Sequence, residues 1–225
     1  MTQPFINTDT YSIPELILFG IGCFMWVIVY ILYARHIFRH KMIGMPVFAA
    51  ASNFGWEFVW GFVQPYTDMG TLFLWGYRAW FLIDLYIFYG LMQHGAAQVS
   101  IPAIKQYFKP LMILTAFCWA LIYYFFKMQG FDTPIGANSA YIAQFLISIL
   151  YLLLILRHHK LVWSSYAISW LRSLGTGFIS VFMVLHYPDN YFLLTLCTLS
   201  ATIDGVYLFV FHRRMAVDHA TATGG

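Results

Sequence analysis

Apolar residues gather in seven long stretches that alternate with short polar or turn-like segments. A helix needs roughly 20 apolar residues to cross the hydrocarbon core of a bilayer. The stretches that qualify or nearly qualify are residues 13–33, 42–63, 71–92, 110–126, 140–156, 166–185 and 191–211. The connections between them are too short to hold a soluble domain. We therefore predict one all-α membrane domain of seven transmembrane helices over residues 1–225, with a disordered tail at 215–225.

The composition supports a membrane protein and argues against the soluble classes. The 225 residues are 61% hydrophobic and 9% charged, whereas soluble domains carry about 25% charged residues. The net charge of +3 comes from only 12 Lys and Arg residues, and no basic run lies outside the segments that flank apolar stretches. Nucleic acid is therefore not an expected partner, and membrane lipids are. The composition leaves the oligomeric state open.

Lys and Arg residues in the short loops predict how the chain is oriented, because they favour the cytoplasmic side. One side carries Arg35, Arg39, Lys41, Lys105, Lys109, Arg157, Lys160, Arg213 and Arg214. The other side carries Lys127 alone. We expect the N-terminus to lie outside (lumenal or periplasmic) and the C-terminus in the cytoplasm, which agrees with an odd number of spans. The membrane would be a bacterial inner membrane or the endoplasmic reticulum.

Five ionisable side chains fall within the predicted spans, where such a residue is costly and indicates function by default. They are Glu57, Arg78, Asp84, Arg172 and Asp204. Conversion of positions to depths at about 1.5 Å per residue places Glu57 level with Arg78 and predicts an ion pair. The same conversion places Asp84, Arg172 and Asp204 in a second layer, where two acids would share one arginine.

Three buried acids therefore stand against two buried bases. One carboxyl is expected to keep its proton near neutral pH, because an unbalanced buried charge is expensive. This argument favours Asp84 or Asp204 as the protonated group, since two carboxyls beside one guanidinium cannot both ionise cheaply. A proton held in an apolar chamber can serve as a general acid. A structural role that fixes helix register is the alternative for Asp84 and Arg172.

Aromatic side chains border the two acids that we favour as functional, Glu57 and Asp204. Their neighbours at helical spacing are Asn53, Trp56 and Trp60 for the first acid and Ser200, Tyr207, Leu208 and Phe211 for the second. Trp56 and Trp80 lie deep in their spans, where a desolvated ring face stabilises a cation by about 2 kcal/mol or more. Most other aromatic side chains are expected in interfacial belts or in the core.

Residue types also exclude or disfavour several chemistries. No lysine lies in a predicted span, which excludes a retinal Schiff base. The aspartates are isolated, without the clustering that would hold Mg²⁺ on a diphosphate, so we expect no metal site. Similar Ile-Asp segments at Asp84 and Asp204 hint at the internal repeat of small transporters. A transporter whose buried charges gate a polar solute or couple protons is the alternative function, and a purely structural subunit is the least favoured.

Three segments together resemble the integral-membrane terpene cyclases: Asn53–Glu57, Arg78-Ala79-Trp80 with Asp84, and Asp204. These small enzymes act in fungal meroterpenoid and indole-diterpene pathways, with bacterial relatives in indole-sesquiterpenoid pathways, and the resemblance covers essentially the whole chain. It implies a proton-initiated cyclisation, by protonation of an epoxide or alkene, of a lipophilic, prenylated, farnesyl-type substrate, and it implies no cofactor. Acidic residues in the second and seventh helices are regarded as essential in that family, and they correspond to Glu57 and Asp204 here.

The resemblance and the charge count thus point to the same two acids. We expect Asp204 to donate the proton and Glu57, bonded to Asn53 and Arg78, to assist it or to take the final proton. The reverse assignment of the two roles stays open. Asp84 and Arg172 would tune the acid. The chamber would be lined by Trp56, Trp60, Trp80 and Tyr207.

Overall fold

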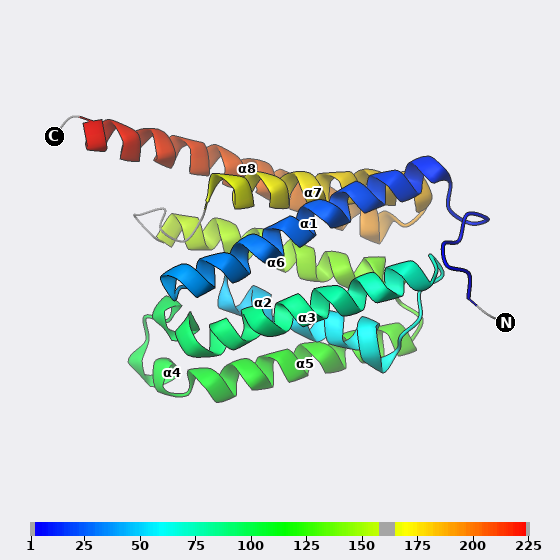
Figure 1. The fold of residues 1–225 in the computed structure, drawn as a ribbon, viewed down its shortest axis with the longest axis horizontal. Helices are drawn as coiled ribbons and strands as arrows, with labels where there is room; N and C mark the ends of the chain where they lie inside the picture. The colour runs from blue at the N-terminus through cyan, green and yellow to red at the C-terminus, as the bar shows by residue number, and fades with distance from the viewer. Residues whose placement is uncertain (1–2, 158–164, 224–225) are drawn as a thin grey trace.

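Long helices make up most of the chain in the computed structural model, which describes residues 3–157 and 165–223 (Figure 1). They are α1 (Ile13–His40), α2 (Val47–Phe58), α3 (Thr71–His94), α5 (Phe108–Met128), α6 (Ala137–Arg157), α7 (Tyr166–His186) and α8 (Tyr191–Thr223). A π-helical turn, η1 (Val59–Val63), continues α2, and two short elements, η2 (Gly95–Gln98) and α4 (Pro102–Gln106), precede α5. The described residues contain no strand. The predicted all-α class is confirmed.

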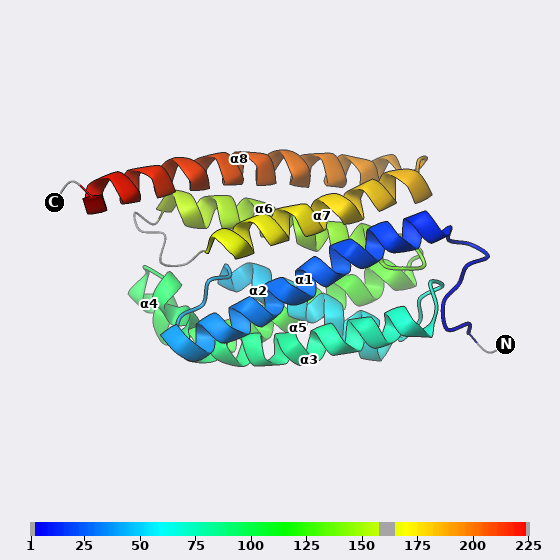
Figure 2. The same cartoon turned by 45° about the horizontal axis from the view of Figure 1, so that its top comes forward.

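Five helices, α1, α5, α6, α7 and α8, are long and apolar enough to cross a membrane. Their outer surfaces carry large apolar side chains, and Phe24, Phe117 and Phe209 are each more than half exposed. Apolar surface on this scale is typical of contact with lipid rather than water. The two chain ends lie at opposite ends of the bundle (Figures 1 and 2). The chain is a multi-pass membrane protein, while its seven spans and its orientation stay predictions.

Three predicted boundaries differ from the structure by five residues or more. The first helix continues to His40 rather than ending at residue 33. The second helix begins at Val47 rather than at residue 42, because Gly44 and Pro46 disfavour helical backbone in the segment before it. The helix α8 continues to Thr223, through most of the tail that we predicted to be disordered. No Gly or Pro interrupts residues 206–223, and Ala and Met favour the helical state. Residue Lys160 and residues 224–225 lie outside the described residues.

Six helices pack in a closed ring in the order α1, α7, α8, α6, α2, α3 and back to α1. The remaining long helix, α5, packs outside this ring against α2. Figure 2 shows α8, α6 and α7 on one side of α1 and α3, α2 and α5 on the other. The ring encloses an interior that side chains from several helices reach, and the candidate site lies there.

The start of α6 is held at the end of the bundle that carries the N-terminus. Asp132 Oδ1 accepts hydrogen bonds from the backbone N–H groups of Thr133, Asn138 and Ser139. Burial raises the pKa of this carboxyl, and the hydrogen bonds oppose that rise. Gly136, with a φ of +77°, lies so close to Trp60 that a Cβ would fall 2.5 Å from the ring. This loop therefore has a defined path where it borders the interior.

The closest helix contact joins α1 and α7 at two glycines. A Cβ added to Gly22 would lie 2.7 Å from the carbonyl oxygen of Gly175 and 2.5 Å from the Cγ1 atom of Ile179. Small residues at this crossing allow the two backbones to approach, as is common between membrane helices. Gly20, two residues earlier, has open space where its Cβ would be.

We predict that Gly22→Ala destabilises the protein by about 1–3 kcal/mol, because the added methyl group forces two backbones apart. The matched control Gly20→Ala should be neutral or slightly stabilising, since it adds helix propensity without a clash. Thermal unfolding of the two variants in detergent micelles compares them directly. Equal melting temperatures for both variants would show that the α1–α7 crossing does not depend on close approach.

Candidate functional site

A cavity lies between the helices of the ring, with about 770 Å³ of free space that includes its opening to the outside. Its wall comes from α1, α2, α3, α6, α7 and the loop before α6. Aromatic side chains supply much of the surface: Phe19, Trp26, Trp56, Tyr77, Trp80 and Tyr141. Along α6 the wall runs from Ala137 to Ile147, ten residues or about 15 Å. A hollow of this size and shape suits an elongated apolar molecule.

Glu57 marks the polar end of this cavity. Its carboxyl is 2% exposed, and Oε1 accepts hydrogen bonds from the Tyr30 hydroxyl at 2.7 Å and from Asn53 Nδ2 at 2.9 Å. Tyr30, Asn53 and Glu57 all line the cavity. The second oxygen, Oε2, has no hydrogen-bond partner among the described residues. One carboxyl oxygen of this wall residue is therefore buried without a partner among the described residues.

Asp84 lies beside Glu57 rather than beside Arg172, so the predicted second layer is wrong for Asp84, although Arg172 and Asp204 do pair. Asn53 Nδ2 is 3.4 Å from Asp84 Oδ2, and this amide therefore lies between the two carboxyls. Side chains tilt toward the N-terminus of their helix. Because α2 and α3 run in opposite directions, the tilt moves Glu57 and Asp84 toward each other. Depths counted from Cα positions alone missed this convergence.

Arg78 does not pair with Glu57, so the predicted ion pair is also wrong. The same tilt carries the Arg78 side chain away from Glu57, toward the end of the bundle that holds the N-terminus. Its Nε donates to the carbonyl oxygen of Gly61 at 3.1 Å, and its guanidinium lies 4.9 Å from the centre of the Trp75 ring. Arg78 is not part of the cavity wall described here.

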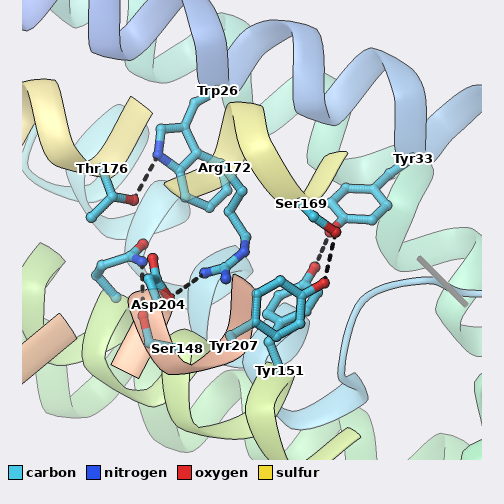
Figure 3. Close-up of polar contacts among 10 residues, drawn as sticks. Trp26, Tyr33, Ser148, Tyr151, Ser169, Arg172, Thr176, Asp204 and Tyr207 are labelled. Atoms are coloured by element: carbon cyan, nitrogen blue, oxygen red, sulfur yellow. Dashed lines mark hydrogen bonds and ion pairs between the residues drawn. The ribbon is translucent and has the colours of Figure 1, made fainter. Parts of the chain in front are cut away.

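Arg172, which is fully buried, forms a separate ion pair. Arg172 Nη1 donates to Asp204 Oδ1 at 2.9 Å, and both side chains are almost fully buried. Figure 3 shows this pair beside the rings of Tyr151 and Tyr207, whose centres lie 4.6 and 4.9 Å from the guanidinium carbon. The pair joins α7 to α8 and does not belong to the cavity wall. Arg172 lies four residues before Thr176 on α7, about one helical turn away, and Thr176 lines the cavity.

The predicted aromatic lining is divided between two places. Trp56 and Trp80 contribute to the cavity wall. Trp60 is fully buried next to that wall, under the Lys127 ammonium at 3.4 Å from its ring centre. Tyr207 is buried in the cluster around Arg172. Two of the four aromatic residues that we predicted to line the chamber, Trp56 and Trp80, therefore line the cavity.

Most polar groups of the wall are bonded to protein. The Trp56 indole N–H donates to Ser139 at 2.8 Å, the Trp26 indole N–H to Thr176 at 3.3 Å (Figure 3), and the Tyr77 hydroxyl to the Ile135 carbonyl at 3.0 Å. Trp80 differs, because its buried indole N–H has no partner within the described part of the chain. The free polar atoms of the wall thus include one carboxyl oxygen of Glu57 and one N–H.

Wall residues that the sequence did not indicate include Tyr30, Gln144 and Thr176. Tyr30 lies at the centre of a long apolar stretch, away from the interfaces where tyrosine usually gathers. That position is a signal that could have been used. Gln144 and Thr176 are neutral and common in helices that pack in membranes, so only the tertiary structure assigns them to the wall.

We predict that Asp204→Asn destabilises the protein by about 3–5 kcal/mol, because it leaves the buried Arg172 guanidinium without its carboxylate. The double variant Arg172→Met with Asp204→Leu should recover most of that loss, since it removes both charges and keeps the volume. Unfolding in detergent, followed by circular dichroism, measures both. A double variant as unstable as the single one would contradict a structural ion pair.

The chain is similar to transmembrane terpene cyclases over most of its length. The sequence model of the Pyr4-like transmembrane terpene cyclases matches residues 7–215. The Pyr4-family terpene cyclase mfmH of Annulohypoxylon moriforme is 24% identical over 190 residues, which are 82% of this chain and 75% of the relative. The terpene cyclase macJ of Penicillium terrestre is 26% identical over 76% of this chain and 68% of its own length.

A third relative matches a shorter part of the chain. The terpene cyclase ascF of Acremonium egyptiacum is 34% identical over 106 residues, 45% of this chain and 37% of its own length. No solved structure gives a significant match.

Proposed function

The chain belongs to the Pyr4-like transmembrane terpene cyclases, and on that premise we propose that it cyclises a prenylated small molecule inside the helix ring. Membership in this family favours an enzyme over the transporter alternative. The observation that carries the proposal is the Glu57 carboxyl at the end of an aromatic cavity, with one oxygen free of protein partners.

Glu57 is the proton donor in this proposal. Among the described residues that line the cavity it is the only carboxylic acid, whereas Asp204 is held by Arg172 outside the wall. The charge count in the sequence favoured Asp84 or Asp204 as the protonated group and led to Asp204 as the expected donor, whereas the position of Glu57 supports the reverse assignment. Asp204 and Arg172 would instead hold α7 and α8 in place and so shape the base of the cavity.

The reaction would convert the substrate into an isomer. The Glu57 O–H bond breaks, its proton forms a new O–H bond on an epoxide oxygen, and the opening C–O bond leaves a carbocation. Alkene π electrons then close one ring after another and move the positive charge along the chain. Loss of a proton from carbon restores a double bond. That proton leaves to a base near the far end of the chain, and Glu57 regains a proton before the next turnover, so the acid is restored and no cofactor or metal is consumed.

The wall fits a substrate of this kind. Ring faces stabilise a desolvated cation by about 2 kcal/mol or more each, and Trp26, Trp56 and Trp80 all line the cavity. A length of about 15 Å suits a farnesyl-type chain. We place its terminal end at Glu57 and its aromatic or heterocyclic head, as in a meroterpenoid, near Ile135 and Ala137.

The membrane arrangement belongs to the same proposal. All seven long helical segments would cross the bilayer, with η1 extending α2 and with α3 shielding Asp84 from lipid. The distribution of Lys and Arg supports an N-terminus on the outer or lumenal side. A lipophilic prenylated substrate would reach the ring from the bilayer, and exclusion of water from the cavity would protect its cations.

We expect membranes that contain the protein to convert a farnesylated acceptor, offered with and without a terminal epoxide, into a product of identical mass. In Glu57→Gln, kcat should fall by about 10²–10⁴, the usual contribution of a general acid. Glu15→Gln is the control, because Glu15 bonds Ser12 and His186 at the start of α1 and not the cavity. Full turnover by Glu57→Gln, measured by liquid chromatography with mass detection, would exclude this donor.

The unpaired Trp80 N–H favours a substrate that carries an oxygen at the reacting end. We expect Trp80→Phe to lower kcat on the epoxide by about tenfold, the loss of one hydrogen bond at the reacting atom. A terminal alkene cannot accept that bond, so its turnover should be unchanged by Trp80→Phe. Comparison of the two substrates with one variant separates the N–H from the ring. Equal losses on both substrates would assign Trp80 to packing or to cation stabilisation alone.

A further inference from the structure

Two buried carboxyls share a single amide at the heart of the ring. Asn53 Nδ2 is 2.9 Å from Glu57 Oε1 and 3.4 Å from Asp84 Oδ2, and both acids are at most 2% exposed. Only Glu57 lines the cavity, and Asp84 lies behind the amide. Asp84 Oδ1 has no hydrogen-bond partner among the described residues. The mechanism outlined above uses Glu57 and leaves Asp84 without a role.

Neither carboxyl has a cation beside it in the described parts of the chain. The salt bridges found there are Arg172 with Asp204 and His186 with Glu15. The titratable groups that interact with this cluster are Tyr30 from α1, Glu57 from α2 and Asp84 from α3. Two adjacent negative charges without a counter-ion would be very costly in an apolar interior. The pair must therefore retain a proton over a wide pH range.

We propose that Asp84 is a positioning residue that keeps Glu57 loaded with the proton used for cyclisation. The pair holds one proton between two acids, and a negative charge on Asp84, behind Asn53, opposes ionisation of Glu57. Glu57 Oε2 is buried without a partner among the described residues, so a carboxylate there would be poorly stabilised, and the protonated form is favoured until a substrate accepts the proton. The catalytic consequence depends on the proposed function, whereas the shared proton does not.

The two acids form an unequal pair because only one of them meets the substrate. Like charges that share a site push the second ionisation to higher pH, as in other carboxyl dyads, so the pair titrates as a unit. Loss of the Asp84 carboxyl would leave Glu57 with two hydrogen-bond donors and no neighbouring charge. Glu57 would then ionise at lower pH than in the wild type, although its burial would still favour the protonated form.

The test is the pH dependence of turnover in Asp84→Asn. We expect the alkaline limb of kcat to move down by about one pH unit or more, so that activity is lost at a lower pH than in the wild type and returns in acid. KM should be unchanged, because Asp84 does not line the cavity. Asp84→Glu keeps the carboxylate and should keep the wild-type limb. Asp68→Asn, which alters a carboxyl bonded to Tyr11 outside the cavity, is the control and should leave the profile unchanged.

A purely structural Asp84 would lower kcat equally at every pH, and an unchanged profile would leave Asp84 without influence on the acid. Either result overturns the proposal. A second measurement works even if Asp84→Asn does not fold. Infrared spectroscopy of the purified wild-type protein should show the C=O band of a protonated carboxyl at neutral pH, and Glu57→Gln should remove it. Absence of that band in the wild type also overturns the proposal.

The infrared result separates this inference from the proposed function. If the wild-type protein shows the infrared band but has no cyclase activity on any farnesylated acceptor, the shared proton is supported and the proposed cyclisation is refuted. If turnover depends on Glu57, but Asp84→Asn changes neither the infrared band nor the pH profile, the shared proton is refuted and the cyclisation is retained.

Discussion

Charge balance in an apolar interior governs this structure. Three acids and two arginines enter the helix bundle, and each must be paired, solvated or neutral because isolated charge is so costly there. Arg78 turns to the end of its helix and bonds to a backbone carbonyl. Arg172 takes Asp204 as its partner. Glu57 and Asp84 are left together, with an amide and a tyrosine as their neighbours. The surplus of acid therefore lies where the cavity ends.

The direction of the helices decides which charges meet. A side chain tilts toward the N-terminus of its helix, so residues on antiparallel neighbours converge or diverge by several ångströms relative to their Cα atoms. Glu57 on α2 and Asp84 on α3 converge, whereas Glu57 and Arg78 diverge. The same geometric rule brings Glu57 and Asp84 together and leaves Arg78 bonded to a backbone carbonyl instead of a carboxylate. No strained element is needed to produce either arrangement.

The cavity wall is selective because so little of it is reactive. Its indoles and hydroxyls are mostly bonded to protein groups such as Ser139, Thr176 and the Ile135 carbonyl. A bound molecule would therefore meet mainly apolar side chains and ring faces, and the unpartnered polar atoms of wall residues include Glu57 Oε2 and the Trp80 N–H. Under the proposed function, such a wall would stabilise a carbocation and offer it few groups that could attack it.

The sequence alone determined the all-α class, the position of each long helix, and the five charged residues within the predicted spans, because long apolar runs and rare ionisable residues are local signals. It also identified Glu57, Asn53, Trp56 and Trp80, which share helical spacing with an acid or lie deep in a span. Only the tertiary structure decided the partners: Asp84 with Glu57, Arg172 with Asp204, and Arg78 with Gly61. Those choices depend on how six helices close into a ring and on the tilt of each side chain, and neither can be read from positions along one helix. The ring likewise brought Tyr30, Gln144 and Thr176 to the wall, since a residue faces a cavity only once its neighbours have packed around it.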